Sequence, residues 1–135
     1  MTQLYRLIYL SQLAPDFTAA CVAHIVRAAR LKNRLIKISG LLVFDGDRFC
    51  QYLEGDAATV GKLADQISDD SRHVDFRVLH QSAFAGPGLM SDYGLEYALN
   101  YDGCLERFES EQNSRSYELF RSLLPSFDME PDSGF

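Results

Sequence analysis

The stretch IKISGLLVFDGDRFCQYLEG, residues 36–55, decides the fold. Two apolar runs, Ile36–Phe44 and Arg48–Glu54, are separated by the short segment Asp-Gly-Asp at 45–47. A glycine in so short a connection supplies the positive φ that a tight turn needs. The stretch therefore predicts a β-hairpin, and Gly55 is expected to end its second strand.

The segments before the hairpin predict one strand and one helix. Leu4–Ser11 alternates and is rich in Leu, Ile and Tyr, which is typical of a strand. Apolar residues then recur at helical spacing from Val22 to Ala29, which predicts a helix with an N-cap at Asp16 and an end near Asn33.

The segments after the hairpin repeat this order. Apolar positions from Val60 to Ile67 predict a second helix that ends around Asp69 or Asp70. Strands are expected at Phe76–His80 and Tyr93–Leu99, on either side of a loop at 85–88 that contains Pro and two glycines.

The order β-α-β-β-α-β-β predicts an α+β, ferredoxin-like sandwich with one mixed sheet and two helices on one face. Residues 1–100 are assigned to this domain and residues 101–135 to a C-terminal helical extension and tail. The segment Cys104–Leu124 is helix-prone, with Tyr117, Phe120 and Leu124 on one stripe, and Pro125 and Pro131 mark its end.

Composition excludes several classes of function. The chain has 135 residues and a formal charge of -6, without a run of Lys or Arg, so binding to nucleic acid through phosphates is not expected. No stretch approaches the roughly 20 apolar residues of a membrane span and the N-terminus is unlike a signal peptide, so the cytoplasm is expected. Cys21, Cys50 and Cys104 lack paired spacing, so no metal site is expected.

Two polar residues lie within predicted strands. Gln51 interrupts an apolar run, and a buried amide without partners costs about 1 to 3 kcal/mol, so a polar group is expected to meet it. Tyr9 lies in the first strand and can be interpreted, taken alone, as a half-buried structural tyrosine.

Four segments together resemble the BLUF family of flavin-binding blue-light sensors, over about residues 3–100. They are LYRLIYLS at 4–11, Asn33 with ISGLL at 38–42, FCQYLEG at 49–55, and DSRH at 70–73. The joint spacing of Tyr, Asn, Gly and Gln-x-x-Glu-Gly carries the resemblance, which no single segment would support.

The resemblance implies a flavin held without covalent attachment between the two helices. FAD is expected, with FMN or riboflavin as alternatives, because Lys32 and Gln66 stand where relatives carry other phosphate-side residues. Tyr9 is then expected to donate an electron and a proton, Gln51 to rearrange its amide hydrogen bonds, and Asn33 to hold the ring. The implied flavin-contact set is Tyr9, Ser11, Ile25, Ala29, Arg30, Asn33, Ser39, Leu41, Phe49, Gln51, Leu53, Asp70, Arg72 and His73.

The function predicted is that of a photoreceptor, not an enzyme, that switches protein contacts through its fifth strand and C-terminal helix. Tyr93 and Leu95 match the relay positions of relatives. An unidentified downstream protein and self-association are expected partners. Two alternatives are a ferredoxin-like binding module without photochemistry and an acylphosphatase-like enzyme, and segment 12–15 lacks the Arg and Gly that the latter needs.

Overall fold

The computed structural model describes residues 4–109 and 114–130. Its centre is a six-stranded mixed sheet with the strand order β4-β1-β3-β2-β5-β6, in which β2 and β5 are parallel and the other neighbours antiparallel. The strands are β1 (Leu4–Leu13), β2 (Ser39–Phe44), β3 (Arg48–Asp56), β4 (His73–Ala83), β5 (Gly94–Leu99) and β6 (Asp128–Glu130).

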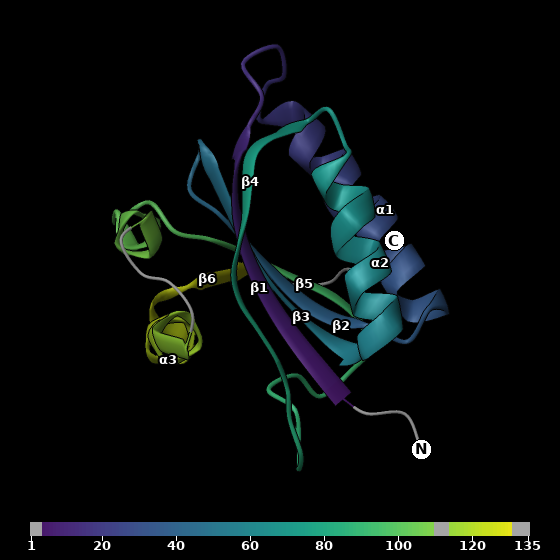
Figure 1. Ribbon diagram of the computed structural model, residues 1–135. Coiled ribbons are helices and arrows are strands. Elements are labelled where there is room, and N and C mark those ends of the chain that lie inside the picture. Colours follow the sequence, from purple (N-terminus) through teal and green to yellow (C-terminus); the bar gives the residue numbers. More distant parts are fainter. Residues whose placement is uncertain (1–3, 110–113, 131–135) are drawn as a thin grey trace.

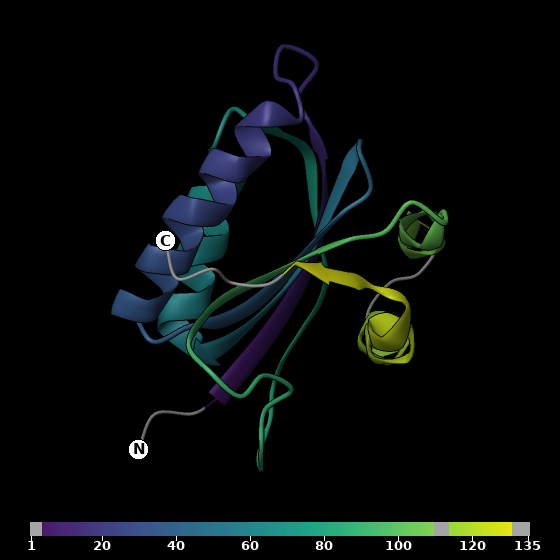
Figure 2. The same cartoon turned by 180° about the vertical axis from the view of Figure 1, so that it is seen from behind.

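Helices cover both faces of this sheet. The helices α1 (Ala20–Leu35) and α2 (Ala57–Ser68) lie side by side on one face, while α3 (Ser114–Leu123) and the 3-10 helix η1 (Cys104–Glu109) lie on the other (Figure 1). A second 3-10 turn, η2 (Leu124–Ser126), leads from α3 into β6. The view from behind shows the same three layers (Figure 2). The predicted ferredoxin-like core with a helical extension is confirmed.

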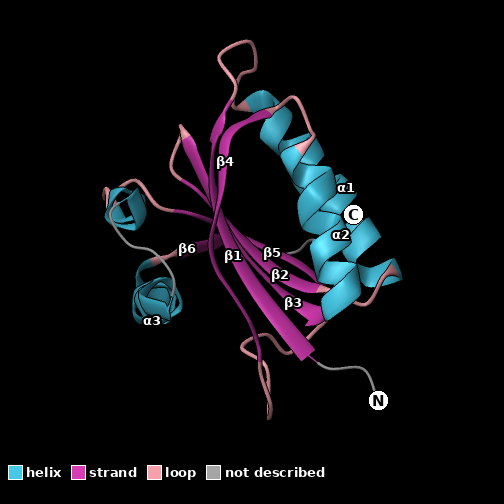
Figure 3. Cartoon of the chain, viewed as in Figure 1, coloured by secondary structure: helices cyan, strands magenta, loops and turns pink. Residues whose placement is uncertain are grey.

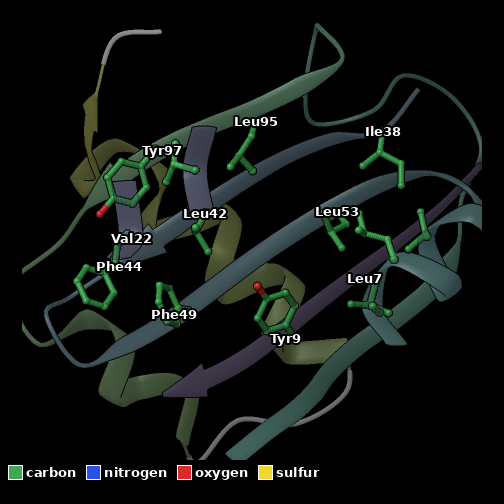
Figure 4. Close-up of a cluster of buried hydrophobic side chains, with 14 residues drawn as sticks. Leu7, Tyr9, Val22, Ile38, Leu42, Phe44, Phe49, Leu53, Leu95 and Tyr97 are labelled. Carbon is green, nitrogen blue, oxygen red and sulfur yellow. The ribbon is translucent and has the colours of Figure 1, made fainter. Parts of the chain in front are cut away.

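Two hydrophobic layers follow from this arrangement. The first lies between the sheet and the helices α1 and α2, and Figure 4 shows its side chains, among them Tyr9, Leu42 and Tyr97. The second lies on the opposite face and contains Phe108 and Phe120 from the C-terminal elements. Because successive residues of a strand point to opposite faces, the middle strands β2 and β3 are buried along almost their whole length.

The hairpin and both main helices form as predicted, with different ends (Figure 3). Asp16 does not cap α1: the helix begins at Ala20, because residues 14–17 form a separate turn in which the Phe17 amide donates to the Ala14 carbonyl. Gly55 does not end β3, which continues to Asp56, and the Asp56 carboxylate caps α2 by accepting from the Thr59 amide.

The other strands also differ from their predicted extents: β1 continues to Leu13 and β5 begins at Gly94. β2 begins only at Ser39, because the chain turns sharply at Lys37, whose φ is +59°. β4 runs from His73 to Ala83, longer than predicted, because β1 pairs with it over its whole length. β6 was not predicted. Part of the helix expected at Cys104–Leu124 is a 3-10 turn, and residues 110–113 and Pro131 lie outside the described residues.

Candidate functional site

A short hydrogen bond joins the two polar residues that the sequence singled out. Tyr9 in β1 and Gln51 in β3 are direct cross-strand partners on the face that α1 and α2 cover. The Tyr9 hydroxyl donates to Gln51 Oε1 at 2.6 Å, and both side chains are buried. Within the described part of the chain, Gln51 Nε2 donates to no protein group, so the donor end of the amide stays available.

The Tyr9–Gln51 pair forms the floor of a cavity of about 220 Å³ between the sheet and the two helices. Residues of α1 spaced three and four apart form one wall, and the end of α2 with the turn that follows it forms the other. The cavity is lined by Tyr9, Ile25, Ala28, Ala29, Lys32, Asn33, Leu42, Gln51, Leu63, Gln66, Ile67, Asp70, Arg72 and His73.

Small and amide side chains on α1 shape the cavity wall. Ala28 and Ala29 leave space where a larger side chain would fill it. Asn33 is buried, and its Nδ2 donates to the Gly94 carbonyl at 3.2 Å, which ties the end of α1 to the start of β5. The side chain of Asn33 is thereby fixed with its amide at the cavity edge.

A second hollow of about 520 Å³ continues the cavity toward solvent between α1 and α2. Lys32, Leu63 and Gln66 line both spaces, and Lys32 Nζ donates to Gln66 Oε1. Lys62 adds a second ammonium group to the outer hollow. The site thus has a largely apolar inner part and a cationic outer part.

At the other end of the cavity, the turn after α2 holds a compact polar group. The Arg72 guanidinium donates to both carboxylate oxygens of Asp70, at 3.0 and 2.6 Å, and it lowers the pKa of that carboxyl. His73 Nδ1 and Ser11 Oγ lie 2.8 Å apart. Burial, and then the neighbouring Arg72 charge, lower the pKa of His73 to about 4, against the opposing effect of Asp70.

Burial also keeps the Tyr9 phenol neutral. Desolvation is the main cause that raises the pKa of Tyr9 well above its ordinary value of 10, with smaller contributions from Cys50 and Asp70. The Tyr9 ring packs against Phe76, with ring centroids 4.7 Å apart, and edge-on to His73. A neutral, tightly packed phenol retains its proton at any physiological pH.

Eight residues of the predicted contact set line the cavity, and six do not. The Ser11 hydroxyl contacts His73 Nδ1, and Phe49 packs its ring against the same imidazole with centroids 4.7 Å apart. Ser39 and Leu53 are buried in the sheet, and Arg30 Nε donates to the Leu95 carbonyl at 3.1 Å.

Leu41 lies on the opposite face of the sheet, in the layer under α3, and its neighbour Leu42 lines the cavity instead. The pleat of β2 accounts for this shift by one residue. Sequence reasoning also missed Ala28, Leu63 and Ile67 as cavity residues, although helical spacing from Ile25 or Val60 places them on the inner faces of the helices.

The two predicted relay residues are placed differently. Leu95 is buried on the helix-facing side of β5, whereas Tyr93 precedes β5 and is 56% exposed. A cross-strand row also runs from Tyr9 through Gln51 and Leu42 to Tyr97, all in direct register. Tyr97 therefore extends the same face of the sheet as the Tyr9–Gln51 pair, a position that the sequence analysis did not identify.

Residues 4–109 and 114–130 form neither a metal site nor a membrane-spanning helix. No group of three His, Cys, Asp or Glu side chains there is placed to hold a metal ion. Within those same ranges, every helix is too short or too polar to cross a lipid bilayer.

Comparison with known proteins gives a consistent family assignment. The family model of the BLUF sensors of blue light using FAD matches residues 4–86. A photoactivated adenylate cyclase subunit beta from Euglena longa is 36% identical over 87 residues, and one from Euglena gracilis is 35% identical over 87 residues. Each match covers 63% of this chain, but the chain spans only about a tenth of those relatives.

Solved structures extend the likeness through the C-terminal elements. The structure of the BLUF domain of BlrP1, a protein of Klebsiella pneumoniae, superposes with a TM-score of 0.70 at 28% identity, covering 92% of this chain and 91% of that one. The photo-activated state of BlsA gives a TM-score of 0.77 at 22% identity, covering 96% and 99%, which shows a shared fold.

Proposed function

This chain belongs to the BLUF family, the sensors of blue light using FAD, and on that premise we propose that Tyr9 and Gln51 detect the excitation of FAD held between α1 and α2. The family is one of flavin-dependent blue-light photoreceptors, and a domain of this kind is not itself an enzyme. The cyclase activity named for the Euglena proteins is a statement about those proteins. A binding module without photochemistry is not favoured.

The residues present fit a flavin. A flat tricyclic ring needs apolar walls on both sides, which Ile25, Ala29 and Ile67 provide, and amides at its polar edge, which Asn33 and Gln51 provide. Gln51 Nε2 is an available donor at the cavity floor. These side chains, with Leu42 and Leu63, would hold the ring.

The outer hollow supports FAD over riboflavin. Lys32 and Lys62 line it beside the polar side chains of Thr59 and Gln66, and ammonium groups of this kind are common phosphate ligands. A flavin that carries a phosphate tail would gain charge-assisted hydrogen bonds there. FMN also carries a phosphate, so these lysines do not distinguish it from FAD. Only contacts beyond this hollow, to the part of FAD that FMN lacks, would do so.

Tyr9 is suited to donate an electron together with its proton. A bound flavin supplies absorption of blue light and accepts one electron. The phenol of Tyr9 is neutral and buried, so it has a proton to lose when it is oxidised, and the first acceptor along its hydrogen bond is Gln51 Oε1, 2.6 Å away. Loss of this proton avoids leaving a buried positive charge on the ring.

The Gln51 amide is suited to change its hydrogen bonds after Tyr9 has lost an electron and a proton. A carboxamide carries a donor and an acceptor on one planar end, so a half-turn of the amide exchanges Oε1 for Nε2 in front of the Tyr9 hydroxyl. The Tyr9 oxygen then accepts instead of donating, and Oε1 faces the cavity. Neither Leu nor Glu at position 51 could make this exchange.

The Tyr9–Gln51 hydrogen bond is the observation that carries the proposal, and illumination of the purified flavin-bound protein tests it. Blue light should produce a reversible red shift of the flavin absorption band, and Gln51→Leu should abolish it. Gln12→Leu, at an exposed position on β1, is the matched control and should keep the shift. A full red shift in the Gln51→Leu protein would overturn the assignment of the amide.

BLUF domains act on effector proteins, and we propose the same for this one, with residues 1–100 as the sensing unit and residues 101–135 as its extension. Self-association and a cytoplasmic location complete the proposal. Association should be measured by light scattering of the purified protein in darkness and under blue light. A strictly monomeric protein in both states would exclude a homo-oligomer.

A further inference from the structure

We propose that the carboxyl group of Glu54 couples the Gln51 segment of β3 to the loop between β4 and β5, on the face of the sheet opposite the cavity. The proposal rests on the proposed function, because it gives the light-driven change at Gln51 a path through the sheet. It assigns Glu54 a positioning role that is separate from flavin binding.

The path begins with the pleat of β3. Gln51 faces the cavity, and the next residue, Tyr52, points to the other face, where it is fully buried. The Tyr52 ring stacks with Phe120 of α3 at a centroid distance of 5.7 Å and an interplanar angle of 22°. One peptide unit therefore separates the cavity floor from the second hydrophobic layer.

Glu54 is the next residue on that second face. It is only 8% exposed, and three donors converge on its Oε1: the Tyr52 hydroxyl at 2.7 Å, the Leu89 amide at 2.8 Å and the Met90 amide at 3.2 Å. A buried carboxyl group is retained only where donors compensate its burial. These contacts fix the β4–β5 loop to β3.

Gly88 makes this close approach possible from the loop side. A Cβ atom at position 88 would lie 1.8 Å from Glu54 Oε2 and 2.6 Å from its carboxyl carbon. Any other residue at position 88 would displace the carboxyl group or the loop. The close contact thus depends on the absence of a side chain at position 88 and on the Glu54 carboxyl group that accepts from the loop amides.

The same patch brings in two other elements, β1 and α3. Arg6 of β1 is the cross-strand partner of Glu54, and its guanidinium lies 4.0 Å from the ring centroids of both Phe84, where the loop begins, and Tyr117 of α3. Close-packed interiors move between discrete arrangements and do not deform continuously. A shift of β3 at Gln51 therefore reaches the loop and α3 together.

Amide hydrogen exchange, measured by NMR on the flavin-bound protein in darkness and under blue light, tests the proposal. In the wild type, illumination should change the exchange rates of the Leu89 and Met90 amides. Glu54→Gln replaces a charged acceptor by a neutral one and should raise both dark-state rates about tenfold, a factor equivalent to about 1.4 kcal/mol. The light–dark difference should disappear while the flavin red shift persists.

Gly88→Ala should reproduce this result without any substitution in β3, and it keeps the test valid if Glu54→Gln fails to fold. Glu118→Gln, at an exposed position on α3, is the matched control and should leave both amides unchanged. In the wild type, a normal red shift with identical exchange of both amides in light and darkness would overturn the role of Glu54 and leave the photoreceptor intact. A protein without any red shift would instead overturn the proposed function, and this proposal with it.

Discussion

Ser11 Oγ and His73 Nδ1 lie 2.8 Å apart in a buried contact at the end of the cavity, although 62 residues separate them in the chain. The contact joins β1 to the first residue of β4, directly beside the turn that holds Asp70 and Arg72. It buries a titratable ring, and this burial has a measurable consequence for stability.

The free energy of unfolding should fall as the pH is lowered from about 6.5 to 4. The pKa of His73 is about 4 in the folded protein and 6.5 in an unfolded chain, so the unfolded state binds the extra proton in this window. The contribution of neutral His73 to stability is fully present above pH 6.5 and is lost toward pH 4, and it amounts to at most about 3 kcal/mol. The pKa of Asp70 is lowered from its ordinary value of 3.8. The stability that Asp70 contributes is therefore lost only below that pH, outside this window.

Urea unfolding of the flavin-bound protein at a series of pH values measures this dependence. His73→Gln should flatten the slope between pH 6.5 and 4. His24→Gln, at an exposed position on α1, should retain it. An unchanged slope in the His73→Gln protein would show that other groups cause the acid sensitivity.

Tyr9→Phe should remove the light response but keep the bound flavin. The substitution retains the buried ring and deletes only the hydroxyl that donates to Gln51. The loss of this donor should cost about 1 to 3 kcal/mol, because Gln51 Oε1 is left buried without a protein donor. Flavin fluorescence should increase and the red shift should be absent; Tyr101→Phe, at a position 69% exposed, should behave like the wild type.

Removal of the outer ammonium groups should separate the flavins by affinity. Lys32→Met with Lys62→Met should weaken FAD and FMN binding about tenfold and leave riboflavin binding within about twofold, because riboflavin has no phosphate to lose a charge-assisted bond. Calorimetric titration of the flavin-free protein measures all three affinities. Lys37→Met, outside the hollow, is the control. Equal weakening for riboflavin would place the lysines against the ring instead.

Phe120→Ala should strongly lower the free energy of unfolding, although Phe120 does not line the cavity. Phe120 is fully buried between Tyr52, Phe108 and Phe127 on the opposite face of the sheet. Truncation of a buried Phe costs about 3 to 5 kcal/mol, whereas Leu35→Ala, at a position 75% exposed, should cost little. Urea unfolding gives both values, and a cost below about 1 kcal/mol for Phe120→Ala would contradict the second layer as described.

The sequence predicted the parts of the fold that local rules determine. The hairpin followed from Gly46, which has a φ of +101°, and from the apolar runs on either side. The helical faces followed from their spacing. Asp16 and Asp56 are equally good capping residues in isolation, and only the tertiary position of the turn before α1 decides that Asp56 acts as a cap and Asp16 does not.

Long-range pairing accounts for what could not be predicted. β6 is only three residues long, all of them exposed, and exists because it pairs with residues 97–99 of β5. The inner position of Leu42 instead of Leu41 depends on the register between β2 and β3, which the sequence leaves open by one residue. Tyr9, Gln51 and Asn33 were identified through the resemblance to the BLUF family that their joint spacing carries, and the remaining cavity residues needed the packing of the helices.

The pairing of β4 with β1 slips twice, between Ile8 and Tyr9 and again between Leu10 and Gln12, whereas β3 pairs with β1 in unbroken register on the other side. Tyr9 consequently has continuous pairing with β3 on one side and interrupted pairing with β4 on the other. A displacement of its ring toward β4 is absorbed where that pairing slips, whereas a displacement toward Gln51 is passed on to β3 through the continuous pairing of β1 with β3. The architecture thus favours the transmission of motion inward, toward the centre of the sheet, over its dissipation at the rim.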